Sequence, residues 1–192
     1  MARLFLAISL PAEVKEKLAE LQNKLAASGA GVRWVRPEGI HLTLKFLGNV
    51  PESRIPEIVS VVQEVVRKNA PAVIRLGVKG VGTFPPRGTP RVVWAGLTGD
   101  LVALARLQQA LEAALARLGF APEKRPFVPH LTLGRVKSAK NKKALLQSVD
   151  RYREEEFVPA QAIAIKELVL YQSTLHPEGA IYTPLRQFPF KQ

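Results

Sequence analysis

His41-Leu-Thr-Leu44 and His130-Leu-Thr-Leu133 are two copies of one tetrapeptide in a chain of 192 residues. Successive side chains of a β-strand point to opposite faces, so each copy places its histidine and threonine on one face and its two leucines on the other. If the leucines pack into a core, both His/Thr pairs face outward. The two strings therefore predict two equivalent strands that each present a polar pair.

The elements around the two strings also repeat. The order strand, helix, motif strand, helix, strand occurs twice, judged by apolar periodicity and β-branched content. In the first half these elements are expected at residues 3–10, 11–25, 41–47, 55–66 and 72–81, and in the second half at 91–95, 101–118, 130–133, 141–149 and 162–171. A turn at Gly48-Asn49 should end the first motif strand, and the proline-rich segment 83–90 should connect the halves.

This repetition predicts an α+β fold with two lobes related by a pseudo-two-fold axis. The length suits one domain over residues 1–192, with the lobes interleaved and one motif in each. Alternating strands and helices would also allow a doubly wound parallel sheet. The lack of a glycine-rich phosphate loop after a strand counts against that fold.

The amino-acid composition limits the partners and the functional groups that are possible for this chain. Lys and Arg number 28 against 16 Asp and Glu, a net charge of +12, so RNA, DNA, nucleotides and anionic membranes are all candidate partners. The absence of cysteine excludes disulfides, thiolate nucleophiles and cysteine-bound metals. No apolar run approaches the ~18 residues of a membrane span, and the apolar N-terminal stretch fits a buried strand. A soluble, cytoplasmic protein is expected.

The duplicated polar pairs are the strongest functional signal. A single His-Leu-Thr-Leu would most simply be a structural strand, but duplication alone would retain core leucines more readily than polar pairs. Because an unperturbed histidine has a pKa of about 6.5, histidine can carry or lack a proton near neutral pH, and a pair of histidines can divide acid and base roles. Threonine hydroxyls beside them can bind phosphoryl oxygens. His41 and His130 lack the carboxylate neighbours of common metal sites, so phosphoester chemistry without metal or other cofactor is expected.

The chain resembles the 2H phosphoesterase superfamily through its paired His-x-Thr-x motifs. Further stretches resemble the bacterial and archaeal branch, the RNA 2′,3′-cyclic phosphodiesterases, also called 2′-5′ RNA ligases. These stretches are Phe5-Leu-Ala-Ile-Ser-Leu-Pro11, Lys45-Phe-Leu-Gly48, Phe127-Val-Pro129 and Leu170-Tyr-Gln-Ser173. The resemblance implies a bilobal fold of antiparallel sheets with helices on the outer faces and a central cleft. It also implies hydrolysis of 2′,3′-cyclic phosphate to 2′-phosphate, and reversible 2′-5′ RNA ligation at the same site with a 5′-hydroxyl RNA in place of water.

The same resemblance implies roles for individual residues. His41 would be the proton donor and His130 the proton acceptor, and the reverse reaction would exchange these roles between the two similar half-sites. Thr43 and Thr132 would bind phosphate. The family also suggests phosphate contact for Arg135 and base stacking for Phe46, yet strict alternation places both on the face opposite the histidines. A bulge or a strand end would be needed to bring them in.

Other features carry weaker signals. Lys137, Lys140, Lys142 and Lys143 could guide an RNA backbone or form an ordinary solvated surface. Trp34 and Trp94 could stack on bases or pack in the core. His176 lies in a turn-like segment without a matching threonine, so a solvated role is expected.

Two alternatives stay open at this point. A nucleotide- or RNA-binding module could use the same cleft without turnover, and the same chemistry could act on a smaller cyclic phosphate or a 2′-5′-linked oligonucleotide. The expected partners are RNA ends or 2′,3′-cyclic nucleotides, with no membrane and no obligate protein partner. A monomer is expected, because the duplication itself supplies a two-fold cleft.

Overall fold

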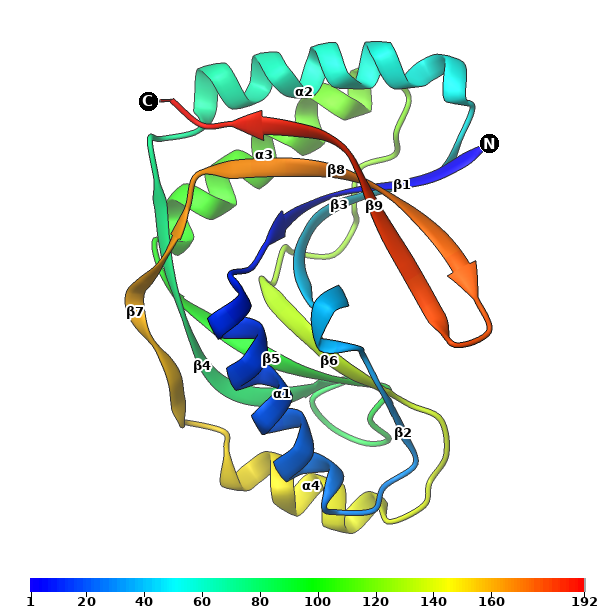
Figure 1. Ribbon diagram of the computed structural model, residues 1–192, viewed down its shortest axis with the longest axis vertical. Helices are drawn as coiled ribbons and strands as arrows, with labels where there is room; N and C mark the ends of the chain where they lie inside the picture. Colours follow the sequence, from blue (N-terminus) through cyan, green and yellow to red (C-terminus); the bar gives the residue numbers. More distant parts are fainter. Residues whose placement is uncertain (192) are drawn as a thin grey trace.

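Two antiparallel sheets form the framework of residues 1–191, which the computed structural model describes (Figure 1). The four-stranded sheet has the order β3–β1–β8–β9, and the five-stranded sheet has the order β2–β6–β5–β4–β7. The strands of the first sheet are β1 (Ala2–Ser9), β3 (His41–Val50), β8 (Glu167–His176) and β9 (Gly179–Pro189). Those of the second are β2 (Val32–Trp34), β4 (Ile74–Phe84), β5 (Val92–Gly99), β6 (His130–Val136) and β7 (Glu156–Ile165). Antiparallel pairing throughout excludes the doubly wound alternative.

The two sheets repeat one arrangement of three strands, but each sheet takes the third of these strands from the other half of the chain. The run β3–β1–β8 of one sheet corresponds to β6–β5–β4 of the other, with a His-Leu-Thr-Leu strand at the start of each run. Yet β4 comes from the first half of the chain and lies beside β5, whereas β8 comes from the second half and lies beside β1. Each sheet therefore contains strands from both halves of the chain.

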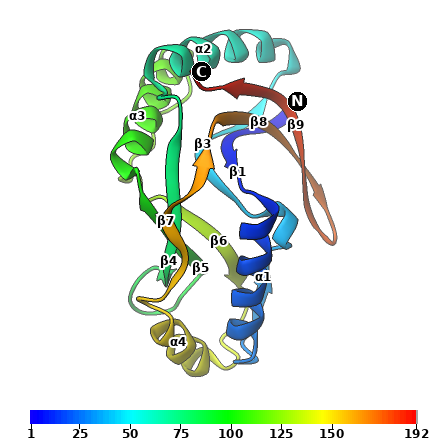
Figure 2. The ribbon, with the colours of Figure 1, turned by 60° about the vertical axis from the view of Figure 1, so that its left-hand side comes forward.

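The helices are exchanged in the same way. They are α1 (Ala12–Ala26), α2 (Ile55–Asn69), α3 (Leu101–Arg117) and α4 (Lys142–Arg151), with short 3₁₀ turns η1 (Pro37–Gly39) and η2 (Glu52–Arg54). Helix α3 follows β5 but packs with α2 beside the four-stranded sheet, and α1 follows β1 but packs with α4 beside the five-stranded sheet (Figure 2). Each helix buries one apolar stripe, as Val14, Leu18, Leu21 and Leu25 do on α1.

Two sequence expectations are wrong. The chain does not turn at Gly48-Asn49, because β3 continues to Val50 and Gly48 takes a positive φ of 74° where the pairing register shifts. The apolar run at 162–171 is not one strand: it divides between β7 and β8, which lie in different sheets. Apolar content alone does not mark the point at which a chain leaves one sheet for another.

The proline-rich segment is the loop between β4 and β5, and it is held by its own hydrogen bonds. The Thr83 hydroxyl donates to the Pro85 carbonyl (3.0 Å), and the Arg91 amide donates to the Phe84 carbonyl (2.8 Å). None of the helices within residues 1–191 is long and apolar enough to cross a membrane.

Candidate active site

A β-bulge in β3 determines which side chains accompany His41. Thr43 lies opposite Ala7 of β1 and Lys45 lies opposite Leu6, so Leu44 is an extra residue in the ladder. After the bulge, Phe46 lies opposite Phe5 and returns to the histidine face. The Phe5 ring lies 4.9 Å from the His41 ring and 6.0 Å from the Phe46 ring, centroid to centroid.

The second motif strand contains a bulge at the equivalent position. On β6, Thr132 lies opposite Trp94 and Gly134 lies opposite Val93, so Leu133 is the extra residue. Arg135 then lies opposite Val92, on the same face as Thr132. Both motif strands thus contain the bulge that is needed to bring Phe46 and Arg135 to the histidine face. Strict alternation, which ignores the bulge, places both residues on the wrong face.

Buried glutamines hold both bulges. Gln22 of α1 donates from Nε2 to the Leu133 carbonyl (2.9 Å) and to the Val35 carbonyl (2.7 Å). Gln108 of α3 donates from Nε2 to the Leu44 carbonyl, over a longer 3.5 Å. Neither glutamine is among the residues predicted from the sequence. Each glutamine could have been found from the sequence, because it is a polar residue on the apolar stripe of its helix. A polar side chain that is buried at such a position needs a hydrogen-bond partner.

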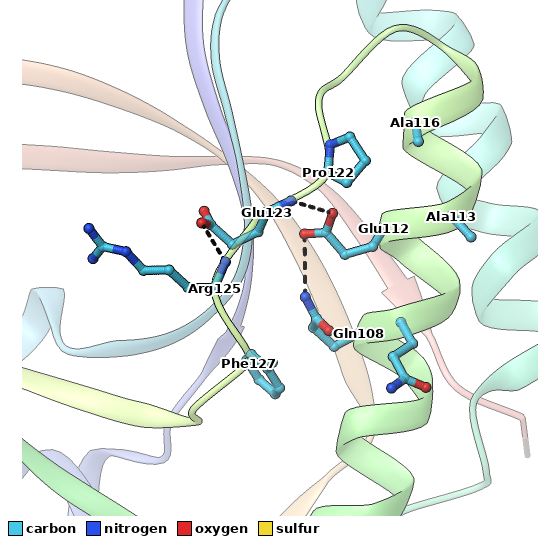
Figure 3. Close-up of a pocket in the computed structure, with 9 residues that line it drawn as sticks. Gln108, Glu112, Ala113, Ala116, Pro122, Glu123, Arg125 and Phe127 are labelled. Carbon is cyan, nitrogen blue, oxygen red and sulfur yellow. Dashed lines mark hydrogen bonds between the residues drawn. The ribbon is translucent and has the colours of Figure 1, made fainter.

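Lys45, the residue after the first bulge, is buried in an ion pair. Its Nζ lies 2.9 Å from Glu112 Oε2 and donates to the Ala121 carbonyl at 2.7 Å. Glu112 also accepts hydrogen bonds from Gln108 and from the Glu123 amide (Figure 3). This network ties β3 and α3 to the loop that leads into the second motif.

The two histidines have the same hydrogen-bonding arrangement. The His41 Nδ1 lies 2.7 Å from the Gly39 carbonyl, and the His130 Nδ1 lies 2.7 Å from the Val128 carbonyl. Because a carbonyl oxygen only accepts, each Nδ1 carries the hydrogen. The Nε2 atom of each ring is therefore the one left to take up or release a proton.

His41 lies among aromatic rings. Tyr182 approaches it edge-on at 5.0 Å between centroids, and Phe5 and Tyr171 stack on one another beside it. Burial lowers the pKa of His41; the hydrogen bond to the Gly39 carbonyl raises it in part, and the charge of Lys15 lowers it further. A lower pKa makes the proton on this imidazolium easier to give up.

His130 has a smaller aromatic neighbourhood. Phe84 meets it edge-on at 4.9 Å between centroids, and Trp94 lies 5.3 Å from Phe84. Trp94 is on the His130 face, because it lies opposite Thr132. Trp34 is on the core face instead, where its ring covers Gly134 so closely that a Cβ there would lie 2.8 Å from it.

The two motif strands contact one another although they belong to different sheets. This contact brings the two motif strands side by side where the sheets meet. Two surface cavities lie elsewhere: one of about 400 Å³ between α3 and the loop at 122–127, and one of about 220 Å³ between β4 and α4. His176 is exposed at the end of β8, and residues 1–191 contain no cluster of three metal-ligating His, Asp or Glu side chains.

Comparison with known proteins gives consistent matches along the chain. The family model LigT like Phosphoesterase matches residues 8–94 and 101–182. The RNA 2′,3′-cyclic phosphodiesterase of Methanocaldococcus jannaschii is 36% identical over 97% of this chain and 99% of that protein. The protein of the same name from Thermotoga maritima is 38% identical over 98% of this chain and 96% of that protein.

Solved structures agree in fold over almost the full length. The crystal structure of TT0787 of Thermus thermophilus has a TM-score of 0.79 and 32% identity, covering 98% of this chain and 97% of that one. Escherichia coli LigT complexed with 3′-AMP has a TM-score of 0.74 and 28% identity, covering 100% and 99%.

Proposed function

The chain belongs to the LigT-like phosphoesterase family, and from that membership we propose that it is an RNA 2′,3′-cyclic phosphodiesterase. It hydrolyses a terminal 2′,3′-cyclic phosphate to a 2′-phosphate. Relatives of that name match nearly its whole length at 36% and 38% identity. The whole chain acts as one bilobal unit, because each half-site lies on a sheet that contains strands from both halves of the chain.

The matched pair of imidazoles carries the mechanistic proposal. Water gives a proton to Nε2 of His130 as its oxygen attacks phosphorus. The bond from phosphorus to the 3′ oxygen breaks, and Nε2 of His41 gives its proton to that oxygen. The products are a 2′-phosphate and a 3′-hydroxyl. Each proton transfer contributes about 10² to 10⁴ in rate.

His41 is assigned as the proton donor by resemblance to the family. Burial lowers its pKa, which makes its imidazolium a stronger acid but leaves a smaller fraction of it protonated near neutral pH. Thr43 and Thr132 donate hydrogen bonds to the non-bridging oxygens, and Arg135 neutralises their charge. Phe46 stacks on the terminal base, a role that its 66% exposed ring suits.

The same site joins RNA ends when a 5′-hydroxyl RNA takes the place of water. The 5′-hydroxyl gives its proton to Nε2 of His130 as its oxygen attacks the phosphorus of the cyclic phosphate. The bond from phosphorus to the 3′ oxygen breaks, Nε2 of His41 protonates that oxygen, and the products are a 2′-5′ linkage and a 3′-hydroxyl. Water at high concentration favours hydrolysis. Neither reaction needs a metal ion, because two imidazoles and hydrogen-bond donors supply the proton transfers and the charge stabilisation.

A binding module without turnover fits the structure less well. A site that only holds phosphate is better served by the permanent charge of arginine or lysine than by two imidazoles. The hydrogen bond from each Nδ1 to a main-chain carbonyl leaves each Nε2 available for proton exchange. A site that only binds a ligand does not require proton exchange.

The decisive experiment uses an RNA that ends in a 2′,3′-cyclic phosphate, with excess chelator. The parent protein should yield a 2′-phosphate, and His41→Ala and His130→Ala should each lose about 10²-fold or more. His176→Ala, which removes an exposed histidine at the end of β8, is the matched control and should keep full activity. Full activity in both motif variants would refute the proposal.

A second substrate distinguishes the proton donor from the proton acceptor. Sulfur in place of the bridging 3′ oxygen makes a leaving group that needs little protonation. His41→Ala should recover most of its activity on this substrate, and His130→Ala should not. The opposite pattern would exchange the two roles.

A further inference from the structure

Two arginines lie directly opposite one another at the edge of the five-stranded sheet. Arg33 of β2 is the register partner of Arg135 of β6, and both side chains are exposed. Opposed residues of an antiparallel pair share a face. Because the bulge at Leu133 places Arg135 on the His130 face, Arg33 lies on that face as well.

The opposed positions of Arg33 and Arg135 are electrostatically unfavourable when no anion is bound. Like charges directly opposite in a sheet repel one another. Within residues 1–191 neither Arg33 nor Arg135 forms an ion pair, whereas Arg36, Arg54 and Arg67 each pair with a glutamate. The Arg33 guanidinium instead donates to a neutral acceptor, the Pro177 carbonyl at 3.1 Å. An anion between the two arginines would relieve the repulsion.

Further positive charge continues from this pair. The Lys137 amide donates to the Gly31 carbonyl (2.7 Å), and the Gly31 amide donates to the Lys140 carbonyl (3.1 Å), so both lysines lie beside the start of β2. Lys142 and Lys143 begin α4 immediately afterwards. We call these six residues the basic tract: Arg33, Arg135, Lys137, Lys140, Lys142 and Lys143. None of the ion pairs found in residues 1–191 involves a member of it.

We infer that the basic tract binds RNA phosphates from the reacting end upstream: Arg135 contacts the reacting phosphate, as proposed above, and Arg33 binds the next phosphate of the backbone beside it. The inference rests on the proposed function and adds a binding residue, Arg33, and a path for the strand upstream of the reacting end. A guanidinium holds a phosphate through two parallel hydrogen bonds, and the lysines follow the backbone as point charges.

The test compares two substrates with the same reacting group: adenosine 2′,3′-cyclic phosphate, and an RNA of about eight nucleotides that ends in it, a length within the usual range of single-strand sites. Arg33→Gln should lower kcat/KM about tenfold on the RNA and less than about twofold on the mononucleotide. Lys137→Gln with Lys140→Gln should act in the same direction. The hydrogen bonds that these two lysines form within residues 1–191 involve their main chain and not their side chains. The control is Arg106→Gln, which removes an exposed arginine of α3 and should change neither value.

A binding measurement decides the inference independently of turnover. The affinity for the same RNA ending in a 2′-phosphate should fall with salt, and Arg33→Gln should reduce the slope of log affinity against log salt by about 0.7. An unchanged slope, equal losses on both substrates, or equal effects in Arg106→Gln would overturn the inference. If the parent protein cleaves neither substrate, the proposed function fails, and the salt slope still tests the tract.

Discussion

Gln22 on α1 donates a hydrogen bond of 2.9 Å to the main-chain carbonyl of Leu133, the extra residue in the second motif strand. The helix follows the strand β1 of one sheet, and the carbonyl belongs to the other sheet. A glutamine side chain therefore joins the helix that follows one sheet to the other sheet, at the residue that turns Arg135 toward the His130 face. Its second bond, to the Val35 carbonyl, also holds the chain where it leaves β2.

Replacing Gln22 with leucine should destabilise the protein and weaken the site together. Two hydrogen bonds would be lost, at about 0.5–1.5 kcal/mol each, because the Leu133 carbonyl still accepts from the Val35 amide (2.9 Å) and the Val35 carbonyl is only partly buried. Gln108→Leu is the matched control on the other half, and its longer bond of 3.5 Å predicts a smaller loss. Urea unfolding gives the stability change, and kcat/KM gives the effect on the site. Equal stability losses in the two variants would contradict this ranking.

The Lys45–Glu112 pair predicts a non-additive double-mutant cycle. Lys45 is 6% exposed and Glu112 is 16% exposed, so Lys45→Met leaves a largely buried carboxylate without its partner. Removing one member of a buried pair costs about 3–5 kcal/mol. Lys45→Met with Glu112→Gln should therefore be more stable than Lys45→Met alone. Urea unfolding of the four proteins in the cycle tests this, and additive losses would show that the pair is not coupled.

Phe46 should affect substrate binding without affecting folding. Its ring is 66% exposed, so Phe46→Ala should change stability by less than about 0.5 kcal/mol. Loss of one stacked base is worth about 1–3 kcal/mol, which predicts a rise of about tenfold in KM with little change in kcat. Val102→Ala, at a 67% exposed valine of α3, is the control for exposed apolar area. An unchanged KM would remove Phe46 from the site.

The sequence predicted the motif strands well, because alternation is a local property of the backbone. Leu42 and Leu44 are buried, and His41 and Thr43 are partly exposed on the other face, as the pattern requires. The positions of Phe46 and Arg135 could not be predicted in this way. A bulge depends on partners across the ladder and on a glutamine from a distant helix, and neither is visible in the local pattern.

The exchange of strands between the two sheets could not be predicted from the sequence pattern either. Helix and strand periodicity identified α1, α3 and the motif strands, since each has an apolar face of its own. Periodicity does not say which sheet a strand joins, so the run at 162–171 was predicted as one strand although Lys166 separates β7 from β8. Composition likewise indicated a polyanion partner, but only the register of Arg33 against Arg135 shows where positive charges meet.

The pKa of His41 leads to a prediction about pH. A general acid must be protonated, so activity is lost as the pH rises through its pKa. Burial and the charge of Lys15 both lower that pKa from its ordinary value of about 6.5.

Lys15→Gln removes the charge and keeps a donor for the Glu38 carbonyl, so it should raise the pKa of His41 and extend activity to higher pH. The control Lys17→Gln removes an exposed lysine of the same helix and should leave the pKa unchanged. NMR titration of the His41 ring proton measures the shift directly, and pH profiles of kcat/KM report its effect on catalysis. A pKa that stays the same or falls in Lys15→Gln would mean that Lys15 does not act on His41 through its charge. A pKa that rises without any extension of the profile would mean that His41 is not the proton donor.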